Sequence, residues 1–248
     1  MIKKKYRYLL RLLIRHSFRY LSDFKIAISA VLVFCLINMA VFVLLPTQPN
    51  QLHPLALSRD QSWGIFTSIF VHENFDHLST NLRNLLLTLL FFFSLSQLES
   101  HSSRIRWSKR FVWLSLVAGI VANAICYLFN FQLPSAGASG VVASATGILL
   151  GRLILDQPAV FKKISIKDKS KKKQLSLKQI IRLSDAIRGM FSWAILFIIA
   201  YPLITDFTTF FNITDGVAWA IHILGFSLGL SIAFLLSVRD YFSNRTKT

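Results

Sequence analysis

Long apolar stretches alternate with short polar or basic segments along this chain. Six of them approach the roughly 20 residues that a helix needs to cross a bilayer. They cover residues 26–45, 78–98, 111–129, 139–155, 190–211 and 217–238, and most are bounded by charged residues or by Pro, Gly or Asn. The pattern predicts an all-α polytopic membrane protein, a bundle of six transmembrane helices.

The basic residues are unevenly placed, and their placement predicts the topology. Of the 28 Lys and Arg, eight precede the first apolar stretch, four lie at 104–110, eleven at 152–188 and three after 238. Apart from Arg83 inside the second stretch, only Arg59 is left for the other loops. Because cytoplasmic loops collect Lys and Arg, we expect both termini inside, an N-in/C-in arrangement.

The formal charge of +17 also helps to decide between nucleic acid and anionic lipid as binding partners. A strongly basic chain can bind nucleic acid, but here each basic block adjoins an apolar stretch. We therefore expect no nucleic-acid partner, and we expect the basic segments to face anionic lipid at the inner membrane surface.

Three regions are expected along the chain. Residues 1–25 form a basic amphipathic segment suited to an anionic membrane surface. Residues 26–238 form the six-helix domain, and 239–248 a short cytoplasmic tail. A prokaryotic cell membrane is the expected location. Since a mitochondrial transit peptide has the same features as residues 1–25, the mitochondrial inner membrane stays an alternative.

Two polar residues lie where lipid disfavours them. Ser139 opens the fourth apolar stretch, within Gly137-Ala138-Ser139-Gly140, and His222 lies in the sixth. Ionisable residues inside a membrane usually face a bundle interior or a cavity and have a function. A serine and a histidine on two spans fit a nucleophile and its base.

His77 and Asn81 lie four residues apart near the outer end of the second stretch, in the order His72-x4-His77-x3-Asn81. Four residues place both on one helical face. Both side chains can donate hydrogen bonds to a developing oxyanion. Under the predicted topology they share an outer layer with Ser139 and His222.

Small residues indicate how the helices meet. Ser139, Ala143, Gly147 and Gly151 recur every four residues, and Ala218, His222, Gly225 and Gly229 form a similar row. Such rows let helix backbones approach closely. The rows would bring the Ser139 hydroxyl within reach of the His222 ring.

At these residues the chain resembles the rhomboid intramembrane serine proteases. The matching motifs are His72-x4-His77-x3-Asn81, Gly137-Ala-Ser139-Gly140 with Gly147 beyond it, and His222-IL-Gly225-FSL-Gly229. The resemblance implies a catalytic dyad of Ser139 and His222 and an oxyanion site made by His77, Asn81 and the Ser139 N–H. It also implies substrates cut within a transmembrane helix near its outer end. The family's Trp-Arg pair in the first outer loop is Trp63-Gly64 here, and the tyrosine that some members carry four residues after the serine is Ala143.

Three function classes follow. The first is an intramembrane serine endopeptidase acting on transmembrane protein substrates, without cofactor or metal. The second is a catalytically silent relative that binds membrane clients, and the third is a small transporter. Retention of both Ser139 and His222 favours the first over the second, and the few acidic residues in the spans disfavour the third. The substrate and the oligomeric state are not specified by these patterns.

Overall fold

The computed structural model describes residues 21–45, 53–96, 99–131, 134–164 and 219–245, with a few positions between 190 and 198. This part of the chain is helical and holds no β-strand. Its elements are α2 (Lys25–Leu44), α3 (Gly64–Thr67), the 3-10 turn η1 (Ser68–Phe70), α4 (Phe75–Ser96), α5 (His101–Phe129), α6 (Ser139–Ile164) and α9 (Trp219–Arg245).

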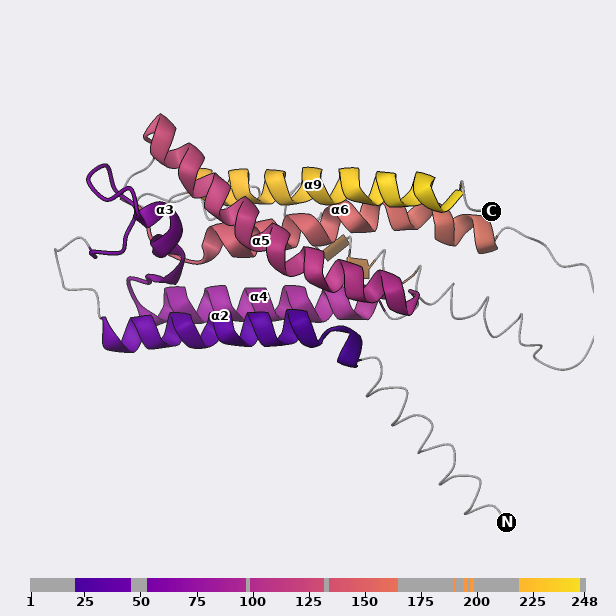
Figure 1. The fold of residues 1–248 in the computed structure, drawn as a ribbon, viewed down its shortest axis with the longest axis horizontal. Coiled ribbons are helices and arrows are strands. Elements are labelled where there is room, and N and C mark those ends of the chain that lie inside the picture. Colours follow the sequence, from indigo (N-terminus) through magenta and orange to yellow (C-terminus); the bar gives the residue numbers. More distant parts are fainter. Residues whose placement is uncertain are drawn as a thin grey trace, which may run out of the picture.

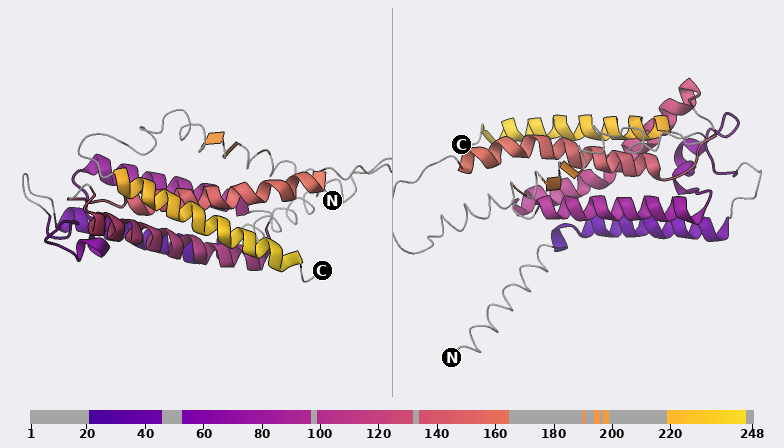
Figure 2. Two further views of the ribbon diagram at one scale, coloured as in Figure 1. Left: turned by 90° about the horizontal axis from the view of Figure 1, so that it is seen from above. Right: turned by 180° about the vertical axis from the view of Figure 1, so that it is seen from behind.

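The long helices lie roughly along one axis in two pairs. α2 lies beside α4, and α6 lies beside α9, the pair with the most extensive contact (Figure 1). α5 crosses obliquely and contacts α2, α6 and α9. α3 and η1 gather at one end, next to the start of α6 (Figures 1 and 2).

Four of these helices are long and apolar enough to cross a membrane. They are α2, α4, α5 and the Trp219–Asp240 part of α9, and α6 adds a shorter apolar stretch, Ser139–Ile154. The predicted stretches 26–45, 78–98, 111–129, 139–155 and 217–238 thus correspond to helices. The stretch 190–211, most of the segment 1–25 and the loop 165–189 lie largely outside the described residues, so the six-span count stays a prediction.

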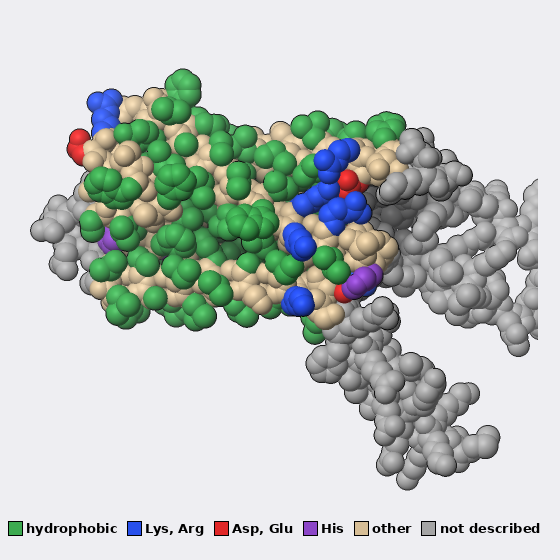
Figure 3. Space-filling model, in the orientation of Figure 1, with side chains coloured by type: hydrophobic (Ala, Val, Ile, Leu, Met, Phe, Trp, Pro, Cys, Tyr) green, Lys and Arg blue, Asp and Glu red, His purple; other side chains and the backbone are tan. Residues whose placement is uncertain are grey.

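On the face shown in Figure 3, apolar side chains cover the middle of the bundle, and charged side chains lie toward its two ends, with the larger group at the right-hand end. Large apolar residues are exposed on several helices, for example Leu36 on α2, Leu90 on α4 and Leu235 on α9. A soluble protein rarely exposes so much apolar surface. The surface fits an integral membrane protein whose helices face lipid.

Three helices extend well beyond their apolar stretches. α5 begins at His101 rather than near residue 111, because Ser100 caps it by accepting a hydrogen bond from the Ser103 N–H at 3.3 Å. α6 continues to Ile164 rather than ending at 155, and α9 continues to Arg245 rather than ending at 238. Hydropathy marks where a helix leaves lipid, whereas capping and turn residues decide where it ends.

Glycines bring α6 and α9 into backbone contact. A side chain on Gly147 would collide with the Phe226 carbonyl, and one on Gly229 with the Ser144 carbonyl. Gly151 is equally confined by the Leu230 carbonyl. The face of α6 against α9 therefore includes Ser144, one residue further along the chain than Ala143 in the predicted row.

Candidate active site

Ser139 is the first residue of α6 and is half-buried. Three contacts fix the loop that leads to it. Ser135 and Leu57 exchange backbone hydrogen bonds of 2.8 Å, the Gly137 N–H donates to the Ser68 carbonyl at 2.9 Å, and the Ala138 N–H donates to Nε2 of His72 at 3.3 Å. The serine therefore lies at a helix N-terminus, where backbone N–H groups and the helix dipole favour negative charge.

The turn of α9 that carries His222 lies against the first turn of α6. A Cβ placed on Gly140 would lie 2.6 Å from Cγ2 of Ile221, and one on Gly225 would lie 2.5 Å from the Gly140 carbonyl oxygen. Ile221 precedes His222 and Gly225 follows it by one turn. His222 is half-buried between these two contacts. The two helices thus present Ser139 and His222 on adjoining turns.

α4 brings His77 and Asn81 next to the loop that precedes Ser139. A Cβ on Gly137 would lie 2.9 Å from Nε2 of His77 and 3.6 Å from Nδ2 of Asn81. Gly137 also has a φ of 121°, which favours glycine. Asn74 caps α4 by accepting a hydrogen bond from the His77 N–H at 2.8 Å. Both α4 side chains therefore adjoin the loop two residues before Ser139.

His72 links these parts, a role that sequence reasoning did not assign. Its side chain is almost fully buried. Its Nε2 lies 3.1 Å from Nδ2 of Asn81 and accepts the hydrogen bond from Ala138. Its ring also stands edge-on to that of His77, with centroids 5.1 Å apart. His72 positions the side chains expected to bind the oxyanion relative to the start of α6.

Burial, with a smaller contribution from His77, lowers the pKa of His72 to about 4. The ring is therefore neutral near pH 7, and its Nε2 can accept the two hydrogen bonds. In the unfolded chain the same histidine titrates near 6.5.

We predict that stability falls between about pH 6.5 and pH 4, because the unfolded chain binds a proton there that the folded chain excludes. Well above pH 6.5 neither state binds this proton, and below about pH 4 the full loss of stability amounts to about 3 kcal/mol. Thermal unfolding of the wild type and of His72→Gln, each measured at pH 7.5 and pH 5, checks this. The variant should lose part of the pH dependence, and equal dependence in both proteins would contradict it.

The loop before α4 is fixed without the arginine of the family's Trp-Arg pair. At that position Gly64 lies so close to residues 56 and 57 that any side chain would strike the Ala56 carbonyl. The Trp63 indole N–H donates to the Pro54 carbonyl at 2.8 Å, and the Thr67 hydroxyl to the Leu55 carbonyl at 2.8 Å. Close backbone packing and two side-chain hydrogen bonds thus hold the loop.

η1 is anchored on α5 by an amide. Asn123 donates to the Ser68 hydroxyl and to the Ile65 carbonyl, both at 3.1 Å. Because the Ser68 carbonyl accepts a hydrogen bond from the Gly137 N–H, Ser68 connects Asn123 of α5 to the loop before Ser139. Nothing in the spacing of these residues along the chain marks this connection.

A metal centre is not apparent in the described part of the chain. Those residues contain no group of three or more His, Cys, Asp or Glu arranged to hold an ion. Cys35 and Cys126 are free thiols, with Cys126 buried against α9 and Leu57. The arrangement at Ser139 offers a hydroxyl, an imidazole and hydrogen-bond donors instead.

Comparison with known proteins identifies the family of this chain. A family model, the Rhomboid domain, matches residues 59–239, a range that includes all the site residues predicted from the sequence. Searches of curated proteins and of solved structures gave no significant match. Because the match covers most of the chain, this protein belongs to the rhomboid family.

Proposed function

We propose that this rhomboid-family protein is an intramembrane serine endopeptidase. One observation carries the proposal. The first turn of α6, with Ser139, meets the His222 turn of α9 through Gly140, Ile221 and Gly225. The family includes inactive members as well as proteases, and this chain retains both groups of the dyad. Transmembrane protein segments are the proposed substrates, and a prokaryotic cell membrane the proposed location.

The proposed reaction begins with attack of Ser139 Oγ on the carbonyl carbon of the scissile peptide bond. His222 accepts the hydroxyl proton as the bond forms. The tetrahedral oxyanion is stabilised by the Ser139 N–H and by donors on His77 and Asn81. His222 then protonates the leaving amine, and the C–N bond breaks to leave an acyl-serine. Water, deprotonated by His222, hydrolyses this ester and restores Ser139.

If His77 and Asn81 stabilise the oxyanion, their loss should slow the reaction without abolishing it. His77→Ala or Asn81→Ala should leave a slower enzyme, because removal of one oxyanion donor lowers kcat about 100- to 1,000-fold. Initial cleavage rates of a single-span reporter in liposomes measure the effect. Ser79→Ala is the control, since Ser79 lies on α4 and, in the described part of the chain, its hydroxyl donates to the Asp76 carbonyl of its own helix. Unchanged rates in both variants and in their double variant would limit these residues to packing.

The proposed topology places both termini and the segment 156–189 inside, with Ser139 near the outer face. It follows from the 26 Lys and Arg in inner segments against Arg59 in the outer loops. A cysteine at Ser170, in a background without Cys35 and Cys126, should react with a membrane-impermeant maleimide only after the membrane is opened. Asp60→Cys should react from outside. Labelling of Ser170→Cys from outside would overturn the topology.

The activity itself is tested with purified full-length protein in liposomes and a reporter with one transmembrane helix. We expect a single cut in the half of the reporter helix nearest the outer face, unaffected by a metal chelator. Stable capture of the reporter with no cut would favour a silent relative. Ion or solute flux without either result would favour a transporter.

A further inference from the structure

Arg83 lies in the middle of a membrane-spanning helix and takes no part in the proposed chemistry. It is exposed on α4, and among the described residues no carboxylate lies within ion-pair distance of it. It lies two positions after Asn81, which places it on nearly the opposite side of the helix. An exposed charge within a span is costly and usually has a function.

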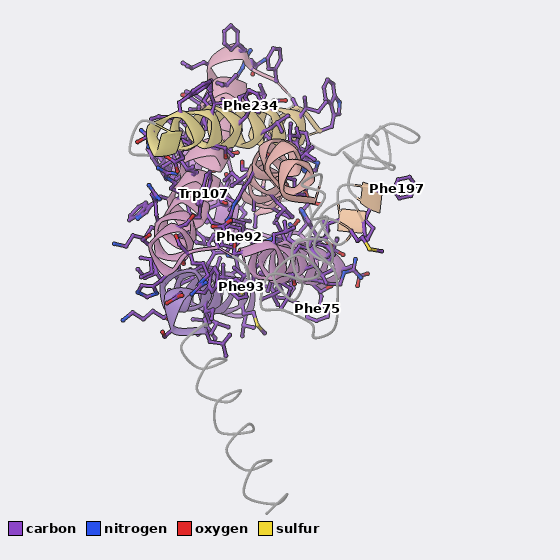
Figure 4. All side chains as sticks on the ribbon, turned by 90° about the vertical axis from the view of Figure 1, so that its right-hand side faces the viewer. Phe75, Phe92, Phe93, Trp107, Phe197 and Phe234 are labelled. Atoms are coloured by element: carbon purple, nitrogen blue, oxygen red, sulfur yellow. The ribbon has the colours of Figure 1, made fainter. Side chains whose placement is uncertain are left out.

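Arg83 borders an apolar groove between α2 and α4. The groove has a volume of about 390 Å³, and Met39 of α2 and Leu82, Leu86 and Leu90 of α4 form part of its wall. It reaches along α4 from Phe75, which Figure 4 shows at the periphery of the bundle, to Leu90. At about 1.5 Å per residue this is about 22 Å. An elongated and mostly apolar groove suits a hydrocarbon chain.

Arg83 and Asp76 are spaced along α4 so that together they could contact a lipid headgroup. Asp76 is exposed and lies seven residues before Arg83, hence on the same face of α4 and about 10 Å nearer the helix start. Side chains on a helix incline toward its N-terminus, and a long arginine side chain in lipid can reach toward the membrane surface, which is the direction of Asp76. A cation deeper in the membrane and an anion above it complement a phosphate with an outer ammonium group.

We propose that this groove binds one phospholipid of the leaflet next to Ser139, with a phosphate on Arg83 and an ammonium headgroup near Asp76. A fatty-acyl chain lies along Met39 and the α4 leucines. Guanidinium and phosphate form charge-assisted, frequently bidentate hydrogen bonds. Asp76 disfavours a purely anionic ligand at the same place, which selects an aminophospholipid over an acidic peptide or an anionic lipid.

The test uses the purified full-length protein in a neutral detergent, titrated with phosphatidylethanolamine or phosphatidylglycerol of the same acyl chains. Native mass spectrometry counts the bound lipid. Arg83→Gln should weaken the binding of one phosphatidylethanolamine about tenfold, and Met39→Trp should weaken both lipids by filling the groove. Asp76→Asn should remove the preference for phosphatidylethanolamine. Lys25→Gln, an exposed cation at the other end of α2, should change nothing.

Specific results would overturn the proposal. Equal lipid binding by the wild type and Arg83→Gln is one, and an equal loss in Lys25→Gln is another. Displacement of the lipid by millimolar inorganic phosphate would reveal a general anion site. Reporter cleavage lost in Arg83→Gln with lipid binding intact would assign Arg83 to a protein ligand. Because Arg83 is exposed, its variant should keep the thermal unfolding midpoint of the wild type, which excludes misfolding as the cause.

Discussion

Ser139→Ala and His222→Ala should each lower cleavage of a single-span reporter by at least about 1,000-fold, because nucleophile and base act as one unit. A serine hydroxyl is a weak nucleophile until a base accepts its proton. The double variant should be little slower than either single variant, since removal of one group already disables the other.

The controls separate chemistry from folding. Ser144→Ala removes a hydroxyl from the same helix, one turn beyond Gly140, where it donates to the Gly140 carbonyl at 2.7 Å. This variant should retain activity within about tenfold, because a lost intrahelical hydrogen bond changes stability only modestly. All three variants should unfold at similar temperatures. Normal turnover in Ser139→Ala or in His222→Ala would require a different catalytic group.

The largest stability effect should come from Arg152→Ala, a loss of about 3–5 kcal/mol. Arg152 is 3% exposed and forms an ion pair with Glu99 and a 2.9 Å hydrogen bond to the Ser96 hydroxyl. Its guanidinium lies 5.0 Å from the ring centroids of both Phe92 and Trp107, which Figure 4 shows in the interior. Truncation would leave the Glu99 carboxylate largely buried beside an unfilled space.

Two further variants test this explanation by equilibrium unfolding in mixed micelles. Arg106→Ala, whose side chain is 45% exposed and 3.9 Å from Asp240, should lose no more than about 1 kcal/mol. Arg152→Met combined with Glu99→Gln should be more stable than Arg152→Ala, because neither change leaves an unmatched charge. A loss of less than about 1 kcal/mol in Arg152→Ala would show that the pair does not stabilise the bundle.

In the described part of the chain hydropathy predicted where the long helices lie, because the length of a span is set by the bilayer rather than by detailed packing. The stretches 26–45 and 78–98 differ from α2 and α4 by no more than three residues at either end. The glycines named from the sequence also lie where side chains would collide, at Gly147, Gly225 and Gly229. Rows of small residues predict helix contacts from the sequence because close helix approach in lipid depends on them.

Contacts between distant segments were not predictable from the sequence. Arg152 was counted with the basic residues of the inner segments, yet it lies buried against Glu99, 53 positions earlier in the chain. His72 likewise stood in a motif without a role, since its partner Ala138 is 66 residues away. Local periodicity carries no information about such pairs. They depend on how whole helices pack.

The central claim is that Ser139 is a nucleophile activated by His222. A biotinylated fluorophosphonate, which reacts covalently with activated serines, tests it on the purified protein in detergent, with the modified peptide identified by mass spectrometry. We predict labelling of the wild type at Ser139, none in Ser139→Ala, and at least about 100-fold slower labelling in His222→Ala. Labelling of another serine, or equal labelling of His222→Ala and the wild type, would contradict the account.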